Sequence, residues 1–172
     1  PDDKLLITES NNELKAWDLL SGKELYVLKG SFYMGNARFS KDGSYIGVPT
    51  SQGNILILES STGKNIRTLN ISIGNVKDCS FSGDGKHLLV ADDIRSGYIF
   101  SLETGKIIRQ LAKHKVDIYT CRFSEDGKYI ITTDANGEAI VWDANDAKTE
   151  VEKPWKDTSA KVIAKFTLEK HA

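Results

Sequence analysis

A five-residue cassette, Phe-Ser-x-Asp-Gly, occurs three times in this chain at a constant spacing. The three copies begin at Phe39, Phe81 and Phe123, so successive copies lie 42 residues apart. A degraded fourth copy, Phe-Thr-Leu-Glu, begins at Phe166. Self-similarity at a period of roughly 40 residues indicates one supersecondary unit stacked several times. The 172 residues therefore predict about four copies of one unit.

Each unit is predicted to hold four short antiparallel strands. The cassette at Phe123 is followed by a β-branched and aromatic run at 128–133, the turn signal Asp-Ala-Asn-Gly at 134–137, and a second run at 138–143. Short runs of this kind, bounded by Gly, Asn and Asp, are typical of strands joined by hairpin turns. No stretch has a sustained helical period. A large apolar residue keeps one register in successive units, at Trp17, Leu58, Phe100 and Trp142.

A unit of this length, with an Asp-Gly turn and a Trp-Asp ending, resembles the WD40 repeat of β-propellers. The resemblance implies an all-β fold: a WD40-type β-propeller built of four-stranded antiparallel blades, with about four repeats in a partial or permuted ring. It gives structural roles to the cassette residues, to both Trp-Asp pairs and to one histidine. These residues are Trp17, Asp18, Phe39, Asp42, Phe81, Asp84, His114, Phe123, Asp126, Trp142 and Asp143.

The hydrogen-bond network of that family, His–Ser/Thr–Asp–Trp, is predicted to be incomplete in every blade. His114 is the one histidine in the expected place, with Thr133 or Asp134 as its partner. Two of the four units lack Trp-Asp. The turn Asp of the family aligns with Asn11, Gln52 and Asn136. We therefore expect blades that are less rigidly cross-linked than in a consensus propeller.

The chain is predicted to be one propeller region, 1–172. It begins without Met and in mid-cassette. Two arrangements stay open: a piece of a larger propeller whose missing blades belong to a parent chain, or a closed ring, either of four permuted blades or of eight in a homodimer. Pro154 disfavours a fourth strand in the last blade, because proline cannot donate in a ladder. The expected blades are 1–29 completed by the strand Val162–Phe166 (162–169), 30–70, 71–112 and 113–153, with an irregular segment at 149–161.

Charge and cysteines narrow the class of protein. The formal net charge is −1 and basic residues are scattered, so nucleic acid is not an expected partner. No run approaches the roughly 18 apolar residues of a membrane span. Cys79 and Cys121 lie one repeat apart, and sheets packed about 10 Å apart are too distant for a disulfide. Buried free thiols favour a cytoplasmic or nuclear location.

The sequence supports no catalytic, metal or cofactor site. The three histidines occupy different phases of the repeat, and the Asp of each cassette recurs because the turn needs it. A propeller-based hydrolase would need acidic residues converging from different blades. Its candidates are scattered along the chain: Glu9, Asp92, Asp93 and Asp117. The leading interpretation is a non-enzymatic scaffold, and the alternative is a structural part of a larger propeller or multi-subunit assembly.

The resemblance implies that protein or peptide partners bind on the loop face and across the channel mouth. Phe32, Tyr33 and Met34 form a run of large residues in one loop, and either contact a partner or fold inward over the blade at Phe32 or Met34. Residues 92–97 are predicted to form a slightly longer turn than their counterparts. Trp155 either docks a partner or covers a blade edge. The remaining candidate contacts are Arg95, Lys113 and Lys115.

Overall fold

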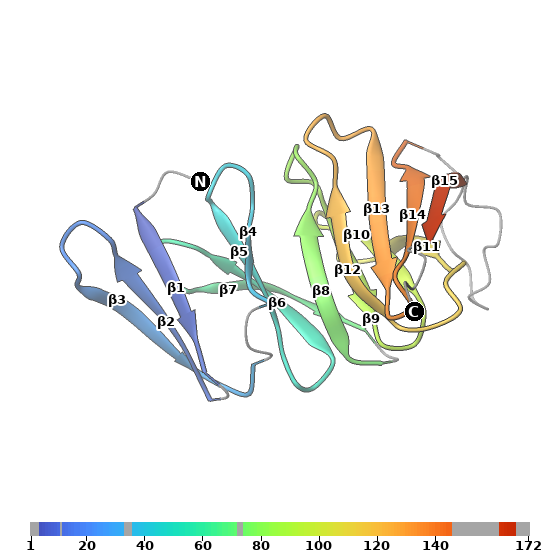
Figure 1. Ribbon diagram of the computed structural model, residues 1–172. Helices are drawn as coiled ribbons and strands as arrows, with labels where there is room; N and C mark the ends of the chain where they lie inside the picture. Colours follow the sequence, from blue (N-terminus) through green and yellow to red (C-terminus); the bar gives the residue numbers. More distant parts are fainter. Residues whose placement is uncertain (1–3, 11, 33–35, 72–73, 146–161, 168–172) are drawn as a thin grey trace.

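The computed structural model describes residues 4–10, 12–32, 36–71, 74–145 and 162–167. These residues form fifteen β-strands and no helix. All pairings are antiparallel, and the strands make four sheets that follow one another along the chain (Figure 1). The all-β fold of four-stranded antiparallel blades is thereby confirmed, as a partial propeller in which the sheets do not close into a ring.

The first sheet has three strands and the other three have four. In each four-stranded sheet the strand that carries the cassette Phe forms one edge. The first sheet is β1 (Leu5–Glu9), β2 (Glu13–Asp18) and β3 (Glu24–Lys29). The second is β4 (Arg38–Phe39), β5 (Tyr45–Pro49), β6 (Asn54–Glu59) and β7 (Asn65–Asn70). The third is β8 (Val76–Phe81), β9 (His87–Asp92), β10 (Gly97–Ser101) and β11 (Ile107–Leu111). The fourth is β12 (Ile118–Phe123), β13 (Tyr129–Asp134), β14 (Glu138–Asp143) and β15 (Val162–Thr167).

The cassette closes the turn between the first two strands of a blade. The Ser40 hydroxyl donates to Asp42 Oδ1 (2.6 Å), while the Tyr45 N–H donates to Ser40 Oγ (2.9 Å). The same serine-to-aspartate bond recurs in the other two cassettes, at 2.6 and 2.7 Å. These bonds hold the pKa of all three cassette carboxyls below the usual value. The recurrence of Asp in the cassette therefore has a local structural cause.

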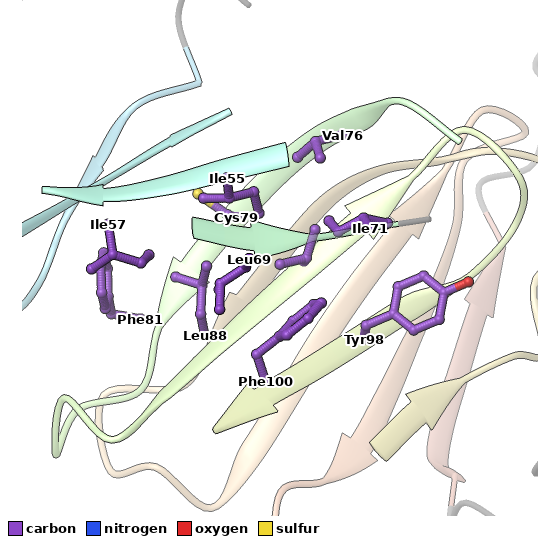
Figure 2. Close-up of a cluster of buried hydrophobic side chains, with 11 residues drawn as sticks. Ile55, Ile57, Leu69, Ile71, Val76, Cys79, Phe81, Leu88, Tyr98 and Phe100 are labelled. Carbon is purple, nitrogen blue, oxygen red and sulfur yellow. The ribbon is translucent and has the colours of Figure 1, made fainter. Parts of the chain in front are cut away.

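Three apolar clusters hold the four sheets together, one at each junction between consecutive sheets. Figure 2 shows the middle cluster, in which Ile55 and Ile57 of the second sheet face Phe81 and Leu88 of the third. A Cβ at Gly47 would lie 3.3 Å from the Phe81 ring, so glycine here lets the cassette Phe lie against the neighbouring sheet. Successive residues of an inner strand point to opposite junctions: Leu88 of β9 lies in this cluster, and Leu89 lies in the next one.

Both cysteines are free and buried at these junctions. The Cys79 thiol contacts the carbonyls of Gly47 in the preceding sheet and of Asn36 in the connection before β4. Cys121 makes the corresponding contacts with the carbonyls of Asp78 and Leu89. Burial raises the pKa of Cys79 to about 12 and that of Cys121 well above its usual value. The small side chain at this position is a packing requirement of the first strand.

The last strand is not where the sequence placed it. β15 pairs with β14, with Val141 opposite Ala164, so it is the outer strand of the fourth sheet. The predictions that it completes the first blade, and that the fourth blade lacks its last strand, are therefore wrong. Pairing covers the edge of β14, and Lys165 Nζ lies 2.7 Å from Glu138 Oε1 across the two strands. Pro154 lies outside the described residues.

Candidate functional site

The hairpins between the second and third strands have one length in the second, third and fourth sheets. The last pairs before the turns are Pro49 with Ile55, Ala91 with Gly97, and Thr133 with Ala139, each spanning the same number of residues. The prediction that residues 92–97 form a longer turn is therefore wrong for the second and fourth sheets, and it holds only against the first sheet, whose last pair is Glu9 with Leu14. The three hairpins can therefore be compared residue by residue.

That comparison singles out Arg95. The turns of the second and fourth sheets have Gly53 (φ 75°) and Gly137 (φ 78°) at the position that Arg95 (φ 73°) occupies in the third. Among the described residues, Arg95 is the only non-glycine residue with positive φ. An L-residue pays roughly 1–2 kcal/mol in this conformation, because its Cβ crowds the following carbonyl. The third hairpin thus presents an exposed arginine where the repeat otherwise uses glycine.

Two lysines lie at the same end of the third sheet. Gly97 pairs with Leu111, so Arg95 and Lys113 are each two residues from one strand pair. Lys115 is exposed, and Lys113 is half-buried with interactions of its own. These cations come from the β9–β10 hairpin and from the connection between β11 and β12.

The nearby carboxylates are engaged locally. The Asn75 N–H and side-chain amide both donate to Asp93, each at 2.7 Å. Asp92 is fully buried, and its Oδ1 accepts from the Ile94 and Ser96 N–H groups (3.0 and 2.9 Å). Burial raises the pKa of Asp92 to about 6, against the lowering effect of those two bonds. The hydrolase candidates in this hairpin therefore have structural partners.

Phe32 is not an exposed anchor. Its side chain is 6% exposed, it bridges Thr50, and it packs with Val48 and Leu58 in the first junction. This corrects its assignment as a partner contact and agrees with the alternative that it folds inward. Tyr33, Met34 and Trp155 lie outside the described residues.

His114 belongs to a complete buried network in the fourth sheet. Its Nδ1 lies 2.9 Å from Asp134 Oδ2 and its Nε2 lies 2.7 Å from Thr132 Oγ1, which also accepts the Trp142 indole N–H (2.8 Å). Because a carboxylate only accepts, Nδ1 carries the proton and Nε2 accepts from Thr132. The prediction of an incomplete network in every blade is wrong here, and Thr132 takes the role expected of Thr133.

The prediction that Asn136 stands at the position of the turn Asp is also wrong in this blade. Asp134 is the turn aspartate, and the Asn136 and Glu138 N–H groups donate to its Oδ1 (2.9 and 3.0 Å). Burial raises the pKa of Asp134, but the bonds from His114 and these two N–H groups outweigh burial, so the pKa lies below the usual value. The carboxyl thus caps the hairpin and holds the histidine.

In the other three sheets, different residues occupy the core positions that correspond to Trp142, Thr132 and His114; we call this set of positions the slot. In the first, the Trp17 indole N–H donates to Thr8 Oγ1 (2.9 Å). In the second, the slot is apolar and holds Phe32 and Leu58. In the third, Phe100 stands in the tryptophan position beside the buried Asp92 hairpin. Together with the fourth sheet, the same strand arrangement therefore accepts four kinds of core chemistry.

A trio of ligand-type side chains occurs in the described part of the chain. His114, Asp134 and Glu138 have ligand atoms within 4.8 Å of one another. Both ring nitrogens of His114 already have hydrogen-bond partners, and Glu138 Oε2 is 3.9 Å from Nδ1. The hydrogen-bond network accounts for this trio.

The described residues also include no helix able to span a membrane.

Comparison with protein-family models gives a match to the WD domain, G-beta repeat, over residues 105–143. This stretch is a WD40 repeat. The match runs from the β10–β11 turn to the end of β14, so it contains every member of the His114 network. No curated protein gives a match to the chain. The WD40 hairpin register of this stretch is shared by the second and third sheets, which carry the same pairings.

Proposed function

We propose that this protein is a non-enzymatic interaction scaffold of the WD40 type, which binds an acidic segment of a protein or peptide partner on its loop face and across the channel mouth. WD40 repeats generally serve as protein-interaction scaffolds. The observation that carries the proposal is Arg95, held at a left-handed backbone position that is glycine in the equivalent hairpins. Lys113 and Lys115 extend the cationic surface.

An exposed arginine at a strained position calls for a reason other than folding. Glycine would relieve the strain at no cost in packing, because the Arg95 side chain is exposed. A guanidinium at a loop tip offers several donors in a planar fork, which suits bidentate binding of a carboxylate. The neighbouring carboxylates are already engaged, so they leave the charge of this side chain to a ligand.

The test replaces Arg95 with the residue that the other hairpins use. We expect Arg95→Gly to stabilise the fold by about 1 kcal/mol and to weaken binding of an acidic peptide several-fold. The probe is a fluorescein-labelled peptide with six glutamates, measured by fluorescence anisotropy at low and at physiological salt. Lys41→Ser removes one exposed cation from a cassette turn of the second sheet and serves as the matched control.

Stability and binding give separate readouts. A variant that gains stability and loses affinity, while Lys41→Ser changes neither, supports the proposal. Equal affinities of wild type and Arg95→Gly, or equal losses in both variants, would overturn it.

The buried free thiols support a reducing location, the cytosol or nucleus, as part of this proposal. A second role, as a structural part of a larger propeller or multi-subunit assembly, is favoured by a different observation: in the described part of the chain, Leu6 of the first sheet and Ile131 of the fourth are 44% and 41% exposed.

A further inference from the structure

A pocket of about 350 Å³ lies at the junction between the first and second sheets. Its apolar wall consists of Leu28 from β3, Leu56 and Leu58 from β6, and Phe32. Small-molecule sites are concave, mostly apolar and about 300–1,000 Å³ in volume, and an apolar cavity of about 150 Å³ can hold benzene. This pocket therefore has the size and the lining to hold an aromatic ring.

The pocket lies at a position where the other two junctions have an aromatic ring. Strand pairing gives Leu58 the same register as Phe100 in the third sheet and Trp142 in the fourth. Each of these side chains is at most 1% exposed and lies in the cluster that joins its sheet to the preceding one. Because leucine is smaller than phenylalanine or tryptophan, the second sheet leaves part of its junction unfilled.

The missing ring leaves two apolar neighbours partly open to solvent. Leu28 and Leu56 are only half-buried. Their counterparts by strand register in the other two junctions are Leu69 and Leu111 for Leu28, and Tyr98 and Ile140 for Leu56. These four counterparts are at most 5% exposed. A ring in the pocket would therefore cover apolar surface that the chain covers by itself at its other junctions.

The charge around the pocket favours an acidic ligand. Among its described lining residues, Lys29 is the one with a charged side chain, and it is exposed. An ammonium group at the rim attracts a carboxylate and repels a second cation. An aromatic ring with a carboxylate therefore matches both the wall of the pocket and its rim.

We propose that this pocket binds one aromatic ring that carries a carboxylate, with the ring against Leu56 and Leu58 and the carboxylate at Lys29. The chain itself identifies the occupant, because a phenyl ring and an indole ring fill the same position in the third and fourth sheets. The ring can belong to a free aromatic acid or to an aromatic side chain beside an acidic residue of a peptide, since both present the same groups. The inference concerns the junction between β3 and β6 and does not depend on the binding of acidic peptides at Arg95.

The first measurement is isothermal titration calorimetry of the full chain with indole-3-acetate, for which we expect one site per chain. Leu58→Phe and Leu56→Tyr place a ring in the pocket from inside, and they introduce the residues that the third sheet has at these positions. Each variant is expected to weaken binding by about tenfold or more, because the pocket cannot hold both rings without overpacking. Folding of both variants is checked by circular dichroism.

Leu25→Phe is the matched control. Leu25 lies on β3, is 48% exposed and does not line the pocket, so this variant adds a ring without filling the site. Its affinity for indole-3-acetate is expected to equal that of wild type.

Tryptamine tests the charge, because it carries the same indole ring with an ammonium group in place of the carboxylate. Indole-3-acetate is expected to bind about two- to fivefold more tightly than tryptamine, which is the range for one exposed ion pair. Lys29→Gln is expected to remove this difference. A capped Asp-Trp dipeptide separates the two sources of the ring: binding as tight as that of indole-3-acetate assigns the site to a peptide partner, and weaker binding assigns it to a free aromatic acid.

The proposal is supported if indole-3-acetate binds wild type and Leu25→Phe equally and binds both filled variants more weakly. Absence of indole-3-acetate binding to wild type overturns it, and so does equal binding to wild type, Leu58→Phe and Leu56→Tyr. Tryptamine that binds as tightly as indole-3-acetate, or more tightly, overturns the assignment of the carboxylate to Lys29.

Discussion

Replacing Asp92 with asparagine is expected to stabilise the protein at neutral pH. Burial raises the pKa of this carboxyl from 3.8 to about 6, so the folded state holds its proton more tightly than the unfolded state. The contribution of Asp92 to stability is therefore fully present below about pH 4 and is lost as the pH rises through 6. A difference of about two pKa units corresponds to about 3 kcal/mol, at 1.36 kcal/mol per unit. The asparagine side chain keeps an oxygen that can accept from the Ile94 and Ser96 N–H groups.

The assay is urea unfolding followed by tryptophan fluorescence at several pH values from 4 to 8. Asp92→Asn is expected to gain up to about 3 kcal/mol over wild type at pH 7 and nothing at pH 4. Asp93→Asn is the matched control with the opposite sign. Burial raises the pKa of Asp93, but the bonds from Asn75 outweigh it, so this variant should lose stability at neutral pH. An Asp92→Asn variant with the pH dependence of wild type would refute the reasoning.

Three further predictions follow from the packing. Thr132→Val should lower the free energy of unfolding in urea by about 1–3 kcal/mol, because it removes the hydroxyl at the centre of the His114 network. Thr133→Val, on the exposed face of the same strand, should lower it by less than about 1 kcal/mol. Gly63→Ala should lower the melting temperature more than Gly127→Ala: both glycines have φ 70°, but only at Gly63 would a Cβ meet the ring of Tyr26, at 2.6 Å. The two buried cysteines should react with a thiol reagent in urea and not in the native state, and fast native reaction would contradict their burial.

The repeat could be predicted from the sequence because each cassette turn is formed by contacts among residues that are close in the chain. The cassette at Phe81 is a turn that hydrogen-bonds to itself, so its Asp and Gly recur wherever the turn recurs. The partner of β15 could not be predicted in this way. Ala164 and Phe166 repeat the spacing of Cys121 and Phe123, which fixes how the side chains alternate between faces and leaves open which strand edge is paired.

The errors in the candidate site have similar causes. The prediction placed the turn Asp at Asn136 because Asn-Gly is a strong turn signal. The carboxyl that caps the hairpin instead belongs to Asp134, the last residue of β13. The unusual position of Arg95 could have been found from the sequence, because it lies one repeat of 42 residues before Gly137 and so takes the place of a turn glycine. The burial of Phe32 depends on contacts with a different sheet, which no local pattern encodes.

The different residues that fill one core position make the sheets respond differently to pH. Above pH 6 the third sheet carries an ionised Asp92 in its interior, so amide hydrogen exchange in β9 and β10 should be faster than it is near pH 4. In acid Asp134 loses the charge that holds His114, so exchange in β13 and β14 should become faster as the pH falls. In the second sheet this position is apolar and has no titrating group, so its pH-corrected exchange rate should stay constant. Near-identical repeats thereby change their local stability in opposite directions as the proton concentration changes.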